Sequence, residues 1–218
     1  MKTRFVFCAL AAFALHAAPA HAQVALLGNF ASPASGVTQQ FASPSIYSVR
    51  FTTGAQPVTV SQAQASLGTL SGTGATMNFG IYSDRLANPS VLLFSLGSQF
   101  ISTEGATPDV TFTGTGSFLL TANTTYHLRG NVTGTASVLW ARTQTVGATP
   151  TAQNGSGIVF NSYRSSPDNG ATYSDFAGFP LRVNILGAIV PESGTFALLL
   201  PALALLGAAV ARRSRRAA

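Results

Sequence analysis

Few side chains in this sequence could carry out acid–base or nucleophilic chemistry. Between Gln23 and Ile189 there is one histidine, His127, and there is no cysteine. A Ser–His–Asp triad or an imidazole metal site in this segment would therefore have to use His127. This residue lies in an alternating segment opposite Tyr126 and Leu128, so we expect a solvent-facing strand histidine.

The acids of the same segment offer two further chemistries, glycoside hydrolysis and calcium binding. Two converging carboxylates suffice for hydrolysis, but the spacing does not bring any two together, and loop acids such as Glu104 and Asp109 are usually solvated. Asp168-Asn169-Gly170 and Asp84 offer oxygen ligands without the twelve-residue pattern of a calcium loop, and Asp-Asn-Gly is typical of a turn. We predict no catalytic residue, no metal and no cofactor, hence a protein that is not an enzyme.

Aromatic side chains are the better candidates for binding. They gather toward the end of the segment, and flat rings with polar edges suit sugar faces as well as cores. We expect Trp140 to be a core residue. Tyr163 and Tyr173 flank a Ser-Ser-Pro-Asp-Asn-Gly loop, which makes them the candidates for an exposed platform that contacts a glycan.

The elements that must position these residues are strands. Period-two alternation recurs over residues 46–52, 77–82, 126–129, 137–142 and 181–185, and turn residues such as Asn88-Pro89 and Asp168-Asn169-Gly170 separate the segments. We predict an all-β domain, an antiparallel β-sandwich of jelly-roll or immunoglobulin-like topology. The alternation predicts that the following residues are buried: Phe51, Phe79, Ile81, Leu93, Tyr126, Leu128, Trp140, Val183 and Ile185.

Two segments depart from this alternation. Residues 91–96 are nearly continuous and apolar, which predicts a strand buried on both faces. Residues 61–75 are expected to be loop-like or to hold a weak strand, and no internal repeat is evident.

The N-terminus has the pattern of a secretory signal peptide. A positively charged start precedes an apolar segment over residues 5–15, and Ala20 and Ala22 provide the small-x-small site of signal peptidase. We predict cleavage before Gln23. Cys8 leaves with the signal peptide, so the mature chain has no disulfide and no thiol nucleophile.

The C-terminus predicts a sorting tail. Pro191, Glu192 and Ser193 precede an uncharged apolar run over residues 195–211, about 17 residues, which is near the minimum for one transmembrane helix. A basic cluster then ends the chain and should act as a stop-transfer signal that stays on the cytoplasmic side. Its members are Arg212, Arg213, Arg215 and Arg216.

This order of elements resembles the PEP-CTERM tail that exosortases of Gram-negative bacteria recognise. The match is Pro191-Glu192, with Ser193 where that tail usually has a second proline. The resemblance implies an exosortase-type transpeptidase as partner, cleavage near Pro191-Glu192, and attachment to or release into the extracellular matrix. A plain single-pass membrane anchor is the alternative.

The β segment resembles a second family, the choice-of-anchor R domain. The resemblance rests on residues 51–54 (Phe-Thr-Thr-Gly), 81–84 (Ile-Tyr-Ser-Asp) and 120–126 (Leu-Thr-Ala-Asn-Thr-Thr-Tyr), followed by Trp140. Asn123 stands where that family usually has glycine, and asparagine also tolerates positive φ. The family occurs with alternative surface anchors and implies no activity and no catalytic residue.

Charge and organisation complete the prediction. The whole chain has a net charge of +6, but between Gln23 and Ile189 six arginines minus five acids leave +1, so we expect no nucleic-acid partner. The predicted parts are a signal peptide (1–22), one β domain (23–189) and the tail (190–218, with its motif at 190–194 and basic end at 212–218). We predict an exported surface or matrix protein of the cell envelope. The alternatives are a module that binds exopolysaccharide and, third, a secreted hydrolase.

Overall fold

The structure is a computed structural model that describes residues 23–70, 74–134, 136–144, 148–175 and 180–190. Within these ranges the chain forms strands and turns and no helix. The strands are β1 (Val24–Gly28), β2 (Ala34–Phe41), β3 (Ile46–Thr52), β4 (Val58–Thr69), β5 (Ala75–Arg85), β6 (Asn88–Ile101), β7 (Asp109–Leu120), β8 (Thr125–Thr133), β9 (Val138–Thr143), β10 (Thr151–Ala152), β11 (Val159–Ser166), β12 (Ser174–Asp175) and β13 (Val183–Ile189).

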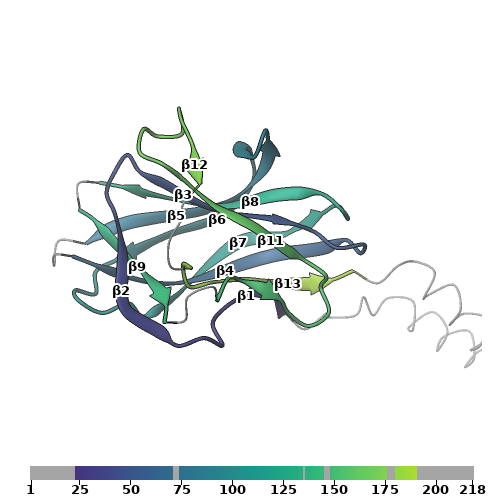
Figure 1. The fold of residues 1–218 in the computed structure, drawn as a ribbon, viewed down its shortest axis with the longest axis horizontal. Helices are drawn as coiled ribbons and strands as arrows, with labels where there is room; N and C mark the ends of the chain where they lie inside the picture. Colours follow the sequence, from purple (N-terminus) through teal and green to yellow (C-terminus); the bar gives the residue numbers. More distant parts are fainter. Residues whose placement is uncertain (1–22, 71–73, 135, 145–147, 176–179, 191–218) are drawn as a thin grey trace, which may run out of the picture.

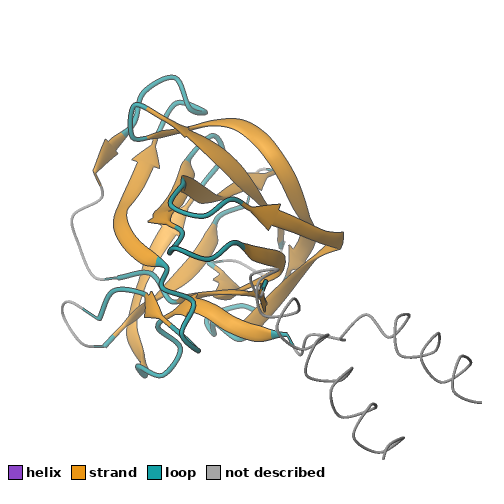
Figure 2. Cartoon of the chain, turned by 90° about the vertical axis from the view of Figure 1, so that its right-hand side faces the viewer, coloured by secondary structure: helices purple, strands orange, loops and turns teal. Residues whose placement is uncertain are grey.

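These strands form two antiparallel sheets, as predicted. The first has the order β10-β1-β13-β4-β9-β2, with β7 also paired to β4, and the second has the order β12-β11-β3-β8-β5-β6. Figures 1 and 2 show the strands of both sheets surrounding one interior. The arrangement is consistent with a β-sandwich.

The core between the sheets consists of the side chains that alternation placed on one face. The ring of Phe79 (β5) lies 4.5 Å from Phe112 (β7) and 5.3 Å from Trp140 (β9), so aromatic contacts join the two sheets. Trp140 is fully buried and its indole N–H donates to the backbone oxygen of Arg182 at 2.8 Å. All residues predicted to be buried are buried except Leu93, which is 36% exposed.

Residues 61–75 were expected to be loop-like or to hold a weak strand, and the structure places a long strand there instead of a loop. Strand β4 runs through most of that segment and lies between β13 and β7 in the first sheet. Neighbouring backbone comes close to one of its small residues, since a side chain at Gly68 would overlap the carbonyl oxygen of Ala106. Ala63 and Ala65 are also fully buried, so they belong to the core.

The prediction for residues 91–96 was wrong. Strand β6 is not buried on both faces but is the last strand of the second sheet, and Val91 and Leu92 are largely exposed. The turn before it is not Asn88-Pro89 but Leu86-Ala87, both with positive φ. The turn predicted at Asp168-Asn169-Gly170 is confirmed, because Asn169 and Gly170 have φ of 56° and 92°.

The two ends of the described domain lie side by side. Val24 at the start of β1 pairs with Gly187 near the end of β13, and the N–H of Val190 donates to the oxygen of Pro57 at 3.1 Å. No helix able to cross a membrane occurs among the described residues. The predicted signal peptide and the tail from Pro191 onward lie outside them.

Candidate functional site

Two hairpins bend over the outer face of the second sheet, the face turned away from the core. One is β5–β6, in which β5 has 11 residues and β6 has 14, and the pairing shifts at three places. Extra residues on one strand of a pair bend the ribbon. The other is β11–β12, and Figure 1 shows its turn and the tip of β5–β6 on the same side of the sheet.

Under these hairpins lies a hydrogen-bonded chain of polar side chains. His127 Nε2 lies 2.8 Å from Asp84 Oδ1, and His127 Nδ1 lies 3.3 Å from the hydroxyl of Ser48. Arg50 donates to both carboxylate oxygens of Asp84, at 2.7 and 3.4 Å. The sheet brings these residues together because His127 on β8 pairs with Arg50 on β3 and with Tyr82 on β5.

The expectation of a solvent-facing histidine was wrong, since His127 has no exposed surface. Burial lowers its pKa to about 4, although the hydrogen bond and charge of Asp84 oppose the shift, and the charges of Arg50 and Arg164 lower it further. Burial also acts to raise the pKa of Asp84, but hydrogen bonds from Arg50 and His127 outweigh it and leave that pKa below its ordinary value. At neutral pH a neutral imidazole therefore faces a carboxylate.

The tautomer follows from these partners. A carboxylate only accepts hydrogen bonds, so the imidazole proton is on Nε2 and donates to Asp84, and Nδ1 accepts from the hydroxyl of Ser48. The order Asp–His–Ser is that of a catalytic triad. Ser48 is 1% exposed, however, and no acyl group can reach its oxygen without displacement of the hairpins. In this arrangement the hydroxyl of Ser48 is enclosed and donates a hydrogen bond to His127.

Arg164 holds the two hairpins over this network. Its guanidinium binds Asp175 of β12 at 2.6 Å and the side-chain oxygen of Asn88, at the start of β6, at 2.8 Å. It also donates to the backbone oxygen of Tyr173 at 3.4 Å. One side chain thus joins β11, its own hairpin turn and the tip of β5–β6.

Tyr163 and Tyr173, the predicted glycan contacts, do not form a common platform. Tyr163 is 6% exposed and packs in the core, where its hydroxyl donates to the oxygen of Leu181 at 3.1 Å. Tyr163 faces the core because it pairs with Val49, which is fully buried. Tyr173 is half-buried over the outer face, and its hydroxyl is enclosed, with no hydrogen-bond partner among the described residues. An exposed strip of both rings is therefore absent.

The remaining acids have local roles. Asp109 binds Arg182 at 2.8 Å and accepts from Ser66, while Asp168 accepts from Thr172 and Ser166 within its turn, which lowers its pKa to about 2. Among the described residues, no three His, Cys, Asp or Glu side chains gather as a metal site would require.

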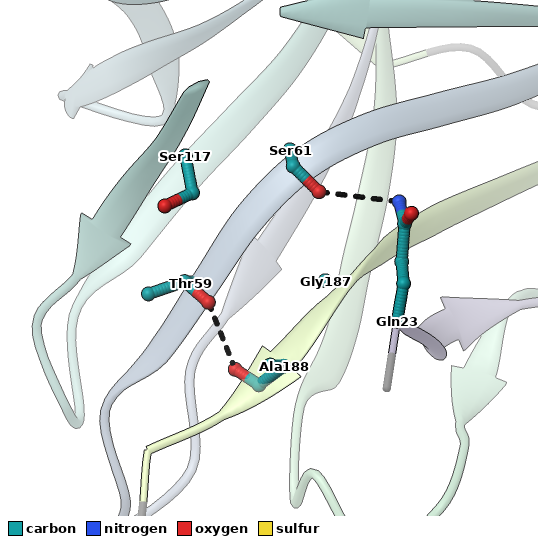
Figure 3. Close-up of a pocket in the computed structure, with 6 residues that line it drawn as sticks. All are labelled: Gln23, Thr59, Ser61, Ser117, Gly187 and Ala188. Carbon is teal, nitrogen blue, oxygen red and sulfur yellow. Dashed lines mark hydrogen bonds between the residues drawn. The ribbon is translucent and has the colours of Figure 1, made fainter. Parts of the chain in front are cut away.

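A shallow hollow of about 320 Å³ lies near the two ends of the domain. Figure 3 shows its lining, in which Gln23 donates to Ser61 at 3.1 Å and Thr59 to the oxygen of Ala188 at 3.4 Å. The remaining residues that line it are Ser117 and Gly187. No acid, histidine or aromatic ring lines this hollow, so it offers neither an acid–base pair nor a stacking surface for a sugar.

Sequence reasoning identified His127 but not its partners. The sequence could have indicated Asp84 as a partner of His127, because the alternation in both segments places these two side chains on the face opposite the core residues. Of the predicted processing residues, the structure describes Gln23; Ala20, Ala22, the motif and the arginines of the tail lie outside the described residues. No protein-family model matches this chain, and no curated protein matches it.

Proposed function

We propose that this chain is an exported, non-enzymatic β-sandwich protein of the cell envelope or extracellular matrix. A C-terminal signal read by an exosortase-type transpeptidase sorts it there. The observation that carries the proposal is the agreement between the ends of the folded domain and the two predicted processing sites. The jelly-roll or immunoglobulin-like topology and the transmembrane helix over residues 195–211 are parts of the same proposal.

The agreement is close at both ends. Strand β1 begins at Val24, directly after the predicted mature N-terminus Gln23. Strand β13 ends at Ile189, and the N–H of Val190 donates to the oxygen of Pro57, so the last described strand ends directly before the Pro191-Glu192 motif. Cleavage at both sites would leave every strand pair of the described residues intact, which is the property a cleavable leader and a cleavable tail require.

The neighbouring positions of the two ends support the same function. Because Val24 pairs with Gly187, the chain enters and leaves the domain at one place. In a domain held through its C-terminal tail, both ends of the domain would then lie at the attachment point. Neither alternative has comparable support: Tyr163 is buried, and the Ser48–His127–Asp84 network is closed to substrates.

The decisive experiment is intact-mass spectrometry of the protein recovered from the envelope and from the medium of an exosortase-containing host. The expected species begins at Gln23 and has lost Arg212 to Ala218. A Glu192→Ala variant should accumulate unprocessed, whereas Glu104→Ala, which removes an exposed loop acid of the domain, should be processed normally. A dominant species that retains the arginines, or normal processing of Glu192→Ala, would leave a plain membrane anchor in place of the sorting signal.

Retention should depend on the tail and not on the β domain. Replacing Arg212, Arg213, Arg215 and Arg216 with neutral residues should weaken retention, because it removes the stop-transfer charges. A matched variant, Arg85→Gln, changes an exposed arginine of the domain and should be retained normally. Unchanged envelope association of a chain that ends at Ile189 would contradict this assignment.

A further inference from the structure

Arg129 is a partly buried arginine on the outer face of the second sheet. It lies on β8, two residues after His127. Three other arginines each bind a carboxylate, in the pairs Arg50 with Asp84, Arg164 with Asp175 and Arg182 with Asp109. Among the described residues Arg129 forms neither an ion pair nor a hydrogen bond, and its guanidinium carbon lies 4.8 Å from the ring centre of Tyr82 on β5. Within the described structure, its positive charge therefore has no counter-charge.

The surroundings of Arg129 contain enclosed hydrogen-bond donors without acceptors. Arg129 and Arg164 lie in one row across the sheet, since both pair with Ser48. The Nε atoms of both arginines and the hydroxyl of Tyr173 are enclosed, and none has a hydrogen-bond partner in the part of the chain that the structure describes. Burial raises the pKa of Tyr173, and the charge of Arg129 opposes the shift, so the ring lies near this guanidinium. We call Arg129, Arg164 and Tyr173 the donor cluster. Because buried polar groups are normally hydrogen-bonded, the cluster lacks an acceptor.

The donor cluster is accessible at the end of the Arg129 side chain. Its Nε is enclosed, but its terminal nitrogens Nη1 and Nη2 are not. The terminal nitrogens of Arg164, in contrast, already donate to the two hairpins. A side chain on Gly80, which pairs with Arg129 on β5, would lie 3.2 Å from the ring of Tyr82, so glycine leaves room for this ring beside the guanidinium. Two donors of a planar group are thus held in place and open to solvent.

Asp168, the acid of the turn between β11 and β12, does not supply the missing acceptor. Its carboxylate accepts from Thr172 at 2.6 Å and from Ser166 at 2.8 Å, and it forms no ion pair with Arg129. Its charge acts on the hydroxyl of Tyr173 in the opposite sense to that of Arg129. An anion is therefore favoured on the side of Arg129 and disfavoured near this turn.

We propose that the donor cluster binds the carboxylate of an acidic sugar, with Nη1 and Nη2 of Arg129 donating to its two oxygens. A guanidinium matches a carboxylate as a planar two-pronged donor, and partial burial strengthens such a charge-assisted bond. The rings of Tyr82 and Tyr173 beside the guanidinium suit the face of the sugar that carries the carboxylate. This contact does not need the exposed strip of Tyr163 and Tyr173 that is absent. The choice of a sugar rests on the proposed function, in which the protein lies in a matrix, but the contact does not depend on processing of the tail.

Calorimetric titration of the full chain, purified in detergent, tests the contact. The probes are oligomers of galacturonate and of mannuronate. Their methyl esters keep the sugar rings and lose the charges, and acetate supplies a carboxylate without a sugar. At least one oligomer should bind, and both its methyl ester and acetate should bind about tenfold more weakly or not at all. Binding should also weaken as the salt concentration rises.

Matched variants separate a contact at Arg129 from general charge attraction. Arg129→Gln should weaken binding of the oligomer by about tenfold or more, because it removes both donors and the charge. Arg85→Gln removes the same charge from an exposed arginine outside the cluster and should leave the affinity unchanged. Arg129→Lys keeps the charge without the planar fork and should bind with intermediate affinity. Protease resistance equal to that of the unchanged chain shows that each variant is folded.

Three results would overturn the proposal. One is that neither oligomer binds to the folded natural sequence. Another is that Arg85→Gln weakens binding as much as Arg129→Gln, or that Arg129→Lys binds as well as the natural sequence. The third is that acetate or inorganic phosphate binds as tightly as the oligomers, which would show an anion site that does not recognise sugar. The sorting proposal is tested separately by the mass of the processed chain, so failure of one proposal is distinguishable from failure of the other.

Discussion

Lowering the pH from about 7.5 to about 5 should destabilise the folded domain through His127. This residue is completely buried, and burial lowers its pKa to about 4, well below the ordinary value of 6.5. Below pH 6.5 the unfolded chain binds a proton at this position, but the folded chain does not. The stabilising contribution is therefore complete above pH 6.5 and is lost as the pH falls toward 4.

The size of the loss follows from the two pKa values. One pKa unit corresponds to about 1.4 kcal/mol, so the free energy of unfolding should fall by about 2 kcal/mol at pH 5 and about 3 kcal/mol at pH 4. The protonation of Asp84 does not contribute to the change in stability over this pH range. Its pKa is below the ordinary 3.8, so its own contribution is lost only at more acidic pH.

Urea unfolding of residues 23–190, followed by Trp140 fluorescence at both pH values, measures the effect. The matched variant is His127→Gln, whose amide can donate to Asp84 and accept from Ser48 but does not titrate. The predicted mature chain has no other histidine, so little else changes protonation in this range. The variant should lose the pH dependence between pH 5 and 7, whatever its stability at neutral pH.

Either of two results would refute the reasoning. The first is an unchanged free energy of unfolding for the natural sequence across this range. The second is the same pH dependence in His127→Gln, which would assign the effect to another group. An NMR titration of the imidazole provides an independent check, since a pKa near 6.5 would mean that the ring is solvated.

Three further predictions concern the stability of the fold and of the two hairpins. Trp140→Ala should lower the free energy of unfolding by about 3–5 kcal/mol by leaving a cavity between the sheets, whereas Val159→Ala at the surface should change it by less than about 0.5 kcal/mol; urea denaturation followed by far-UV circular dichroism distinguishes them, because the first variant lacks the only tryptophan. Gly187→Ala should cost about 1–3 kcal/mol because the added carbon overlaps the carbonyl oxygen of Thr59, while Gly36→Ala meets no atom and should be tolerated in the same assay. Arg164→Gln should speed hydrogen exchange at the amides of Asn88 and Asp175, which its guanidinium joins, and Arg85→Gln should not; equal exchange in both variants would show that Arg164 does not hold the hairpins together.

Alternation predicted the parts of the fold in which one strand face meets the core. Phe51, Ile81 and Leu128 are buried as expected because β8 pairs with β3 on one side and with β5 on the other without a register shift. The same reasoning did not predict strand β4. Its Ala and Gly residues give little contrast between faces, and the reason for their small size is a close approach of distant backbone that local sequence does not reveal.

The two largest errors about the site have one physical cause, the bend of the β5–β6 hairpin. Three extra residues in β6 interrupt the period-two pattern, so residues 91–93 no longer alternate between faces and become exposed together. The same bend carries Asp84 and Asn88 back over the sheet, where they cover His127 and meet Arg164. The alternation within a single strand does not predict this bend, because the bend is caused by the difference in length between two paired strands. The burial of His127 and the exposure of residues 91–93 therefore have the same cause, the bend of this hairpin. A change that straightened the hairpin would expose His127 and alter the exposure of residues 91–93.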